Sequence, residues 1–262
     1  MQSQPSHQTA LEQIRVGTAG WCVPVEVAKR FPGSGTHLER YSKRLPCAEI
    51  NSSFYRPHRR ETYAKWASQT PAEFRFAVKI PKVITHELRL RSAREPLQVF
   101  LQQVRGLGPK LGPLLVQLPP SLDFEPRVAA RFFGMLRELH DAAVVCEPRH
   151  LGWFDTRGDR LLARFRIGRV AADPAIVEIA GQPGGWTGAQ EGASTVYFRL
   201  HGAPRVYWSN YRTERLAAWA AELVRIAPSS PAWCIFDNTA SGAAIKNAME
   251  VMQIVQHPRQ VC

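Results

Sequence analysis

The chain has 262 residues, of which 45% are hydrophobic, and carries a formal net charge of +12. This length suits one large domain, and a single α/β barrel is commonly of this size. No run of about 18 apolar residues occurs, and no basic start is followed by an apolar stretch, which argues against a spanning helix and a secretory signal. We therefore expect a basic, cytoplasmic protein that is not bound to a membrane and that attracts anionic partners.

Apolar runs of strand length alternate with amphipathic helical patterns along the chain. In chain order, strands are expected at 14–18, 47–51, 74–79, 114–118, 143–147, 168–172, 195–200 and 233–237. The amphipathic segments are 37–45, 59–69, 95–107, 125–139, 212–226 and 241–255. Two connections carry weaker patterns: a helix around 157–165 and the glycine-rich stretch 180–192, which reads as loop.

Eight strands that alternate with helices predict a single (β/α)8 TIM-like barrel, with parallel strands and loop insertions at the C-terminal face. We assign residues 13–256 to the barrel, 1–12 to a disordered N-terminal tail and 257–262 to a C-terminal tail. A doubly wound open sheet is the alternative, but no GxGxxG motif follows the first strand. Five cysteines without a CxxC pair favour free thiols over a disulfide framework or a zinc ribbon.

Polar side chains end each expected strand, at the face where barrel enzymes carry their chemistry. In three cases they come as pairs two residues apart, which share one face of a strand: Glu49/Asn51, Glu147/Arg149 and Arg199/His201. Buried charges must be neutralised or must bind something, because an unpaired buried ion costs several kcal/mol. A salt-bridge network with a purely structural role is one interpretation, and a ligand site is the other.

Several stretches also match a known family in order along the chain. They are VGTAGW (16–21), AEINSSFYR (48–56), FRFAVK (74–79), ITH (84–86), KLGPLLVQLPP (110–120), CEPRH (146–150) with Trp153, AADPA (171–175), YFRLHG (197–202) and CIFDNTASGAA (234–244). Over nearly its whole length the chain resembles the DUF72 family of YecE-like proteins. The resemblance implies a TIM-barrel-like fold and brings no established reaction.

Two departures from the family pattern change local expectations. Many members continue after the first motif with a Tyr and a second Trp, where this chain has Cys22-Val23-Pro24. The usual Phe-Asn-Asn reads Phe236-Asp237-Asn238 here, which adds an acid that should point away from Asn238.

The leading hypothesis is an enzyme that acts on a phosphorylated or carboxylated small molecule by acid/base chemistry at the barrel mouth. The candidate catalytic residues are Glu49 or Glu147 as general base, His201 as partner acid, and Asp173. Lys79, Arg149 and Arg199 are expected to hold the anion. Further candidates for substrate binding are Trp21, Asn51, Tyr55, His86, Gln117, Trp153, Tyr207 and Asn238. No cofactor and no metal are expected.

Other chemistries remain open at this point. A divalent ion on Glu49, Glu147, Asp173 and His201 is disfavoured by the cations at the same mouth. A Schiff base on Lys79 would need a depressed pKa. The basic segment 75–110 allows a nucleic-acid-binding module, although it matches no nucleic-acid motif. The remaining hypothesis is a scaffold protein that has kept the barrel fold but has no catalytic activity. The sequence does not fix the substrate, the oligomeric state or whether 180–192 forms a lid.

Overall fold

The computed structural model describes residues 11–31, 33–187 and 195–257. Each expected strand is present, and the sixth is divided in two at Val170. The strands are β1 (Ile14–Ala19), β2 (Cys47–Ile50), β3 (Arg75–Lys79), β4 (Leu111–Gln117), β5 (Val144–Glu147), β6 (Gly168–Arg169), β7 (Ala171–Asp173), β8 (Gly184–Gly185), β9 (Val196–Leu200) and β10 (Ala232–Phe236). Nearly all of the two predicted tails, and residues 188–194 of the glycine-rich stretch, lie outside the described residues.

The sheet runs in the order β7-β9-β10-β1-β2-β3-β4-β5-β6-β8. Its pairs are parallel except for β6 with β8. Because β6 pairs with β5 while β7 pairs with β9, the two sides of the sheet meet on the single segment 168–173. The sheet therefore curls into a barrel, which confirms the TIM-like prediction and rules out the open alternative.

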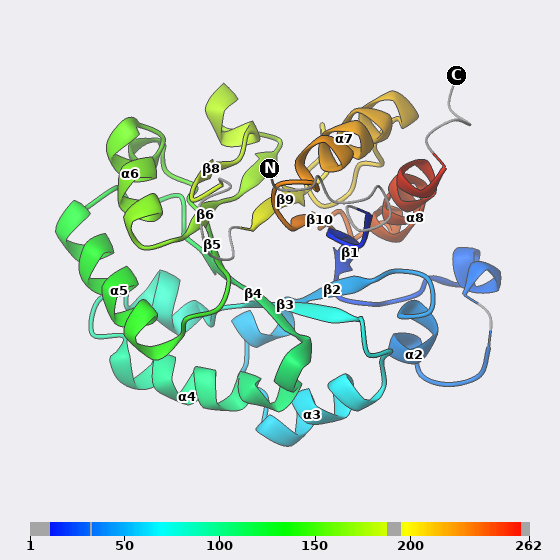
Figure 1. Ribbon diagram of the computed structural model, residues 1–262, viewed down its shortest axis with the longest axis horizontal. Helices are drawn as coiled ribbons and strands as arrows, with labels where there is room; N and C mark the ends of the chain where they lie inside the picture. The colour runs from blue at the N-terminus through cyan, green and yellow to red at the C-terminus, as the bar shows by residue number, and fades with distance from the viewer. Residues whose placement is uncertain (1–10, 32, 188–194, 258–262) are drawn as a thin grey trace, which may run out of the picture.

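Helices surround the strands on the outside (Figure 1). The α-helices are α2 (His37–Tyr41), α3 (Arg60–Ser68), α4 (Arg94–Val104), α5 (Pro126–Leu139), α6 (Thr156–Arg164), α7 (Thr213–Ile226) and α8 (Ala243–Gln256). Short 3₁₀ or π-helical segments are η1 (Val25–Arg30), η2 (Ser52–Phe54), η3 (Val83–Glu87), η4 (Arg105–Lys110), η5 (Leu151–Trp153) and η6 (Glu178–Gly181). The weakly predicted helix α6 forms, and its N-cap Asp155 accepts hydrogen bonds from two backbone N–H groups. After the sixth strand, η6 and β8 stand where a longer helix would otherwise lie. None of the helices in these ranges has the length and hydropathy needed to cross a bilayer.

Two separate apolar clusters follow from strand alternation. The larger fills the space between the sheet and the helices, and it contains outward residues such as Ala48, Val78 and Phe198. The smaller lies inside the barrel and consists of Cys47, Ala77, Leu115, Val145, Val170, Tyr197, Trp233 and Ile235. The inner cluster closes the lumen, so the barrel is a packed core with a floor rather than a pore.

Two glycines give contrasting predictions for stability. A Cβ on Gly17 in β1 would overlap the carbonyl oxygen of Cys47, whereas a Cβ on Gly134 in α5 would meet Phe165 at an ordinary 3.4 Å. We expect Gly17→Ala to lower the free energy of unfolding by about 1–3 kcal/mol, as overpacking does. Gly134→Ala should raise it by about 0.5–1 kcal/mol, because Gly is a poor helix former. Urea denaturation of both variants checks this, and equal effects would contradict it.

Candidate active site at the barrel mouth

Several strands carry a polar side chain that faces the lumen, two residues beyond their inner-cluster residue and toward the C-terminal end of the strand. Two residues beyond an inner-cluster member, alternation returns the chain to the same face. The resulting pairs are Cys47 with Glu49, Ala77 with Lys79, Leu115 with Gln117, Val145 with Glu147, Tyr197 with Arg199, and Ile235 with Asp237. Each of these polar residues is buried. Side chains far apart in the sequence thereby meet at the C-terminal ends of the strands, as predicted.

Arg199 is the centre of this mouth cluster. Its Nη2 lies 2.9 Å from Oε1 of Glu49 and 3.0 Å from Oδ2 of Asp237, and its Nη1 lies 3.1 Å from Oε2 of Glu147. Its Nε also donates to Glu49, whose Oε2 accepts a further hydrogen bond of 2.9 Å from the hydroxyl of Tyr197. All three guanidinium nitrogens are thus occupied by carboxylates of the chain itself. Arg199 therefore has no free donor for a ligand anion, and only the other cations of the mouth could bind one.

His201 bridges two of the same carboxylates. Its Nε2 lies 3.0 Å from Oε1 of Glu147, and its Nδ1 lies 3.0 Å from Oδ2 of Asp237. Burial alone would lower the pKa of His201, but the charge of Glu147 and the hydrogen bonds to both acids outweigh it and raise the pKa. With an acceptor on each nitrogen, the imidazole is held as a cation that donates from both sides.

The two bridged acids respond in the opposite direction. Burial would raise the pKa of Glu147, but Arg149, Arg199 and His201 together hold it well below its usual range. Burial would likewise raise the pKa of Asp237, and Arg199 with His201 hold it low. A carboxylate so strongly stabilised is a weak base, so Glu147 fits the role of orienting His201 better than the predicted role of general base.

Lys79 stands apart from this network. Its Nζ lies 3.9 Å from the centre of the Phe54 ring, and none of the described residues forms a hydrogen bond or an ion pair with it. Burial and the nearby charge of Arg199 lower the pKa of Lys79 to about 8. The mouth therefore contains a buried amino group whose three donor positions lack a protein acceptor among the residues described.

Arg149 and Lys79 both lie near enough to His86 to affect its charge. Arg149 donates from Nε and Nη2 to Oε1 of Glu147, at 3.1 and 3.0 Å, and its side chain keeps 26% of its surface exposed. Burial, Lys79 and Arg149 lower the pKa of His86 to about 4. The ring of His86 packs edge-on against Phe54 at 4.9 Å. A neutral imidazole with two cations around it is a setting that favours an anion.

Three more predicted residues lie around the mouth, and a fourth, Trp21, lies apart from it. Gln117 is buried beside Glu147 in the strand register, and the buried Oδ1 of Asn51 has no hydrogen-bond partner among the described residues. Tyr55 is 76% exposed next to Phe54. Trp21 lines a separate cavity of about 520 Å³ between the end of β1 and the start of α8.

Tyr207 is also at this end of the barrel. Its ring packs edge-on against His201 at 5.8 Å, its hydroxyl interacts with Arg149, and its backbone has a φ of 69°. A non-glycine residue in the left-handed region is strained, and such strain is held by surrounding contacts. Tyr207 therefore covers His201 and Arg149 from above.

Asp173 does not join the mouth cluster, which corrects the sequence-based prediction. Its carboxylate accepts hydrogen bonds of 2.8 Å from the hydroxyl of Tyr211 and from Nη2 of Arg215. The four acids and bases predicted to hold a metal are therefore not brought together. Within the described ranges, no group of three or more His, Cys, Asp or Glu is arranged to hold a metal ion.

Trp153 and Asn238 also differ from the expectation of ligand contact. Trp153 is buried, packs against Phe124 at 4.9 Å, and donates from its indole nitrogen to the carbonyl of Leu122. Asn238 donates to the backbone of Ser209 and to the side chain of Asn247. Both side chains tie connecting segments to the barrel.

Asp237 and Tyr197 are site residues that the sequence analysis did not assign. The signal for Asp237 was present, because it follows Ile235 at a spacing of two and alternates with Asn238. The spacing did not show whether Asp237 or Asn238 faces the lumen. Tyr197 reads as an ordinary strand residue, and only its contact with Glu49 reveals its role.

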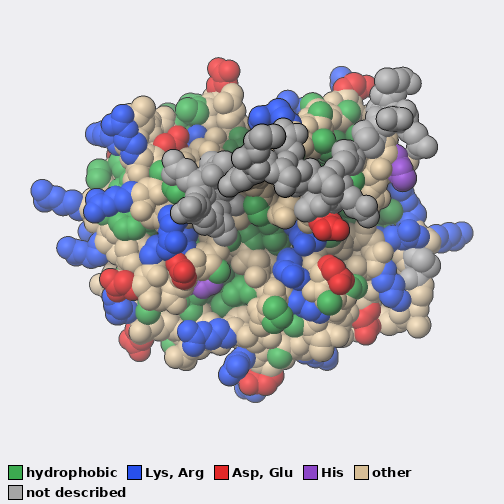
Figure 2. Space-filling model, viewed as in Figure 1, with side chains coloured by type: hydrophobic (Ala, Val, Ile, Leu, Met, Phe, Trp, Pro, Cys, Tyr) green, Lys and Arg blue, Asp and Glu red, His purple; other side chains and the backbone are tan. Residues whose placement is uncertain are grey.

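Several cations of the basic segment 75–110 are paired within the protein. Lys82 pairs with Glu87, Arg91 with Glu125 and Arg94 with Glu138, while Lys110 donates to the backbone carbonyls of Ala67 and Thr70. Figure 2 shows Lys and Arg at the edges and also near the middle of one face, with acidic side chains among them. No specific observation favours nucleic acid as the ligand.

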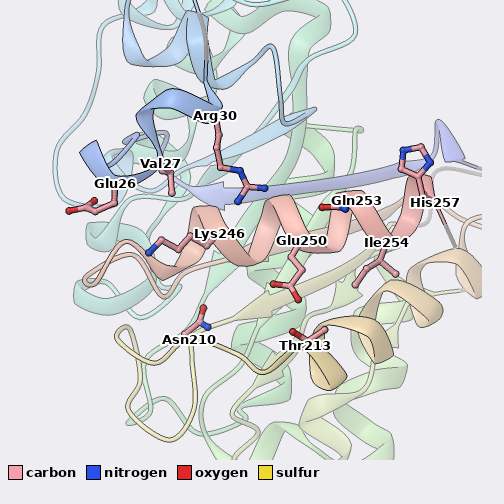
Figure 3. A pocket seen from close by; sticks show the side chains of 10 residues that line it. All are labelled: Glu26, Val27, Arg30, Asn210, Thr213, Lys246, Glu250, Gln253, Ile254 and His257. Atoms are coloured by element: carbon pink, nitrogen blue, oxygen red, sulfur yellow. The ribbon is translucent and has the colours of Figure 1, made fainter. Parts of the chain in front are cut away.

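A larger hollow, of about 690 Å³, lies away from the mouth (Figure 3). It is bounded by η1, α8 and the residues around Asn210, and its lining mixes the basic Arg30 and Lys246 with the acidic Glu26 and Glu250. None of the mouth residues described above lines it. Because basic and acidic side chains both line this hollow, it favours neither an anionic nor a cationic ligand.

The fold and the mouth together define an α/β-barrel protein with a buried acid–base cluster at the C-terminal ends of its strands. The family described as "Protein of unknown function DUF72" matches residues 15–262, and the chain belongs to this family. The resemblance expected from the motifs is thus confirmed.

Known relatives are similar in sequence and in fold. The UPF0759 protein YecE of Escherichia coli K12 is 35% identical over 126 residues, which are 48% of this chain and 44% of YecE, so the match spans less than half of that protein. The UPF0759 protein YunF of Bacillus subtilis is 23% identical over 92% of this chain and 94% of its own. A crystal structure of a DUF72 family protein from Enterococcus faecalis superposes with a TM-score of 0.75 at 20% identity, covering 93% of this chain and 95% of that one. This likeness supports the barrel fold alone.

Proposed function

We propose that this protein is an enzyme that binds a small phosphorylated or carboxylated molecule at the barrel mouth and transfers protons through His201. The observation that carries the proposal is the unpaired cation Lys79. A network built only for stability has no need of a cation that forms an ion pair with none of its acids, although Glu49, Glu147 and Asp237 lie near enough to favour its charge.

The charges of the mouth balance before Lys79 is counted. Three carboxylates face two guanidinium groups and a protonated imidazole: Glu49, Glu147 and Asp237 against Arg149, Arg199 and His201. A protonated Lys79 therefore adds one positive charge without an internal partner. A ligand with one or two negative charges would supply that partner, and Arg149 offers a partly exposed guanidinium edge beside it.

His201 is suited to proton transfer for a geometric reason. Glu147 and Asp237 fix its ring from both nitrogens, so the imidazole is oriented and kept charged. In the proposed reaction it is the acid, and a substrate oxygen replaces one of the two carboxylates as the acceptor of its N–H; Glu147 and Asp237 are positioning residues. Glu49, bound by Arg199 and Tyr197, is assigned to holding Arg199 in place.

We expect Arg149→Gln to weaken the binding of inorganic phosphate about 10-fold or more, because a hydrogen bond between charged groups contributes about 1.5–3 kcal/mol. Isothermal titration calorimetry measures this, with circular dichroism to confirm an intact fold. The matched control is Arg215→Gln, whose exposed guanidinium pairs with Asp173 at the same end of the barrel and should leave the affinity unchanged. Equal affinity in wild type and Arg149→Gln would refute the assigned anion site.

The enzymatic part of the proposal has its own test. A panel of phosphorylated and carboxylated metabolites should contain at least one that raises the melting temperature of the wild type. Turnover of that compound should be lost in His201→Gln. A barrel without chemistry would bind none of the panel.

A further inference from the structure

The amino group of Lys79 is placed differently from those of other lysines in the described residues. Lys82 forms an ion pair with Glu87, and Lys110 donates to two backbone carbonyls and the hydroxyl of Thr70. Lys79 instead lies over the Phe54 ring at the end of β3 and is 5% exposed. The Phe54 ring and the nearby carboxylates favour the charged amine, but burial and the charge of Arg199 outweigh them and lower the pKa of Lys79.

The backbone around Lys79 fixes this position. The hydroxyl of Ser53 donates to the carbonyl of Lys79 at 2.7 Å and to that of Ile50 at 3.0 Å. These two bonds hold the turn η2, which carries Phe54, against the ends of β2 and β3. Phe54 in turn packs against His86 and Tyr55. The amino group is therefore presented to the mouth by a rigid support rather than by a loop.

We infer that Lys79 is a nucleophile that forms an imine with an aldehyde or ketone carrying a carboxylate or phosphate. The inference rests on the proposed function, in that Arg149 holds the anionic group while the carbonyl carbon meets Nζ of Lys79. It narrows the substrate to anionic carbonyl compounds and adds a covalent step that anion binding alone does not require.

The chemistry balances with groups of the same mouth. The lone pair of Nζ forms the C–N bond as the carbonyl π pair moves to oxygen, and a proton passes from nitrogen to that oxygen to give a carbinolamine. His201 then gives up its hydrogen bond to Asp237 or Glu147 and donates that proton to the hydroxyl, the C–O bond breaks, and one water leaves behind a protonated imine. No electrons are transferred to or from another reactant.

The state of the amine at ordinary pH supports this step. With a pKa of about 8, about a tenth of the Lys79 side chains are neutral at pH 7. An ordinary exposed lysine with a pKa near 10.4 has only about one neutral amine in a few thousand at that pH. The neutral, reactive fraction of Lys79 is therefore about 200-fold larger than that of an ordinary lysine.

Borohydride trapping on the full-length protein tests the inference. Wild type is incubated with glyoxylate, or with acetaldehyde as a neutral probe, reduced with borohydride, digested and analysed by mass spectrometry. We expect reductive addition of one glyoxylate on Lys79, at least 10-fold above that on Lys82, rising with pH to half its maximum near pH 8. Lys79→Arg keeps the charge but forms no imine, and should show no modification at position 79. Because the site is mapped in wild type, the result does not depend on that variant folding.

The outcomes separate this inference from the proposed function. Labelling spread over exposed lysines, with none favoured at Lys79, overturns the imine even if phosphate still binds in an Arg149-dependent way. Equal labelling of Lys79 by both probes, without phosphate binding, keeps the nucleophile and overturns the anionic substrate. Labelling by glyoxylate that falls in Arg149→Gln, while labelling by acetaldehyde persists, supports both.

Discussion

We expect the Arg199→Met variant to lose about 3–5 kcal/mol of unfolding free energy, the largest effect of any single change in the mouth. Arg199 neutralises Glu49, Glu147 and Asp237, all of which are buried. Without the guanidinium group, these acids repel one another in a medium of low dielectric and must take up protons to remain inside. Urea denaturation followed by circular dichroism at neutral pH measures the loss.

The control for this variant is an arginine whose pair is exposed. Arg94 lies 2.6 Å from Glu138, and both side chains are more than half exposed. Exposed pairs contribute about 0–1 kcal/mol, so Arg94→Met should change stability little. Adding Glu49→Gln to Arg199→Met should restore part of the loss, since one uncompensated carboxylate is removed. If Arg199→Met is as mild as Arg94→Met, the mouth cluster is not the closed network described here.

We expect His201→Gln to be less stable than wild type by about 1–3 kcal/mol at about pH 6, the typical contribution of hydrogen bonds to charged groups. This difference should shrink as the pH rises. The pKa of His201 is raised above its unfolded value of about 6.5, so its stabilising contribution is fully present below that value. The contribution is lost as the pH rises through the raised pKa of the folded state.

The opposite trend is expected from the acids of the same cluster. The pKa values of Glu147 and Asp237 are lowered, so their contribution is present above the unfolded values and is lost as the pH falls through the folded ones. Chemical denaturation of wild type and His201→Gln from about pH 5 to 9 measures the arm of His201, and the arm of the acids needs points below about pH 4. A stability difference that stays constant or grows from pH 6 to 9 would show that His201 is not a stabilised cation.

Most residues of the mouth were predicted from the sequence, but their pairing was not. Glu49, Lys79, Glu147, Arg199 and His201 were found because an apolar run ended in a charged residue at each site. Which cations are free for a ligand was not predictable, since the pairing of Arg199 with three acids depends on distances across the lumen. The sequence treats Lys79 and Arg199 alike, whereas the structure separates an unpaired amine from a saturated guanidinium group.

Asp173 and Asp237 illustrate the limit most clearly. Both are acids at the ends of strands, and the prediction favoured Asp173. In the fold, Asp173 meets Tyr211 and Arg215, whereas Asp237 meets Arg199 and His201. Spacing alone gives two faces for each strand end, and only the closure of the barrel decides which face is the inside.

The amino-acid sequence by itself determined the alternation of eight strands with helices, the barrel that this implies, and the collection of charged groups at one end of it. These follow from local periodicity, which acts over a few residues and needs no knowledge of neighbours. The tertiary structure alone decided the partners: the carboxylates that surround Arg199, the two acids that hold His201, and the isolation of Lys79. Coulomb energy and desolvation depend on separation in space, and residues such as Glu49 and Arg199, 150 positions apart, acquire that separation only when the sheet closes.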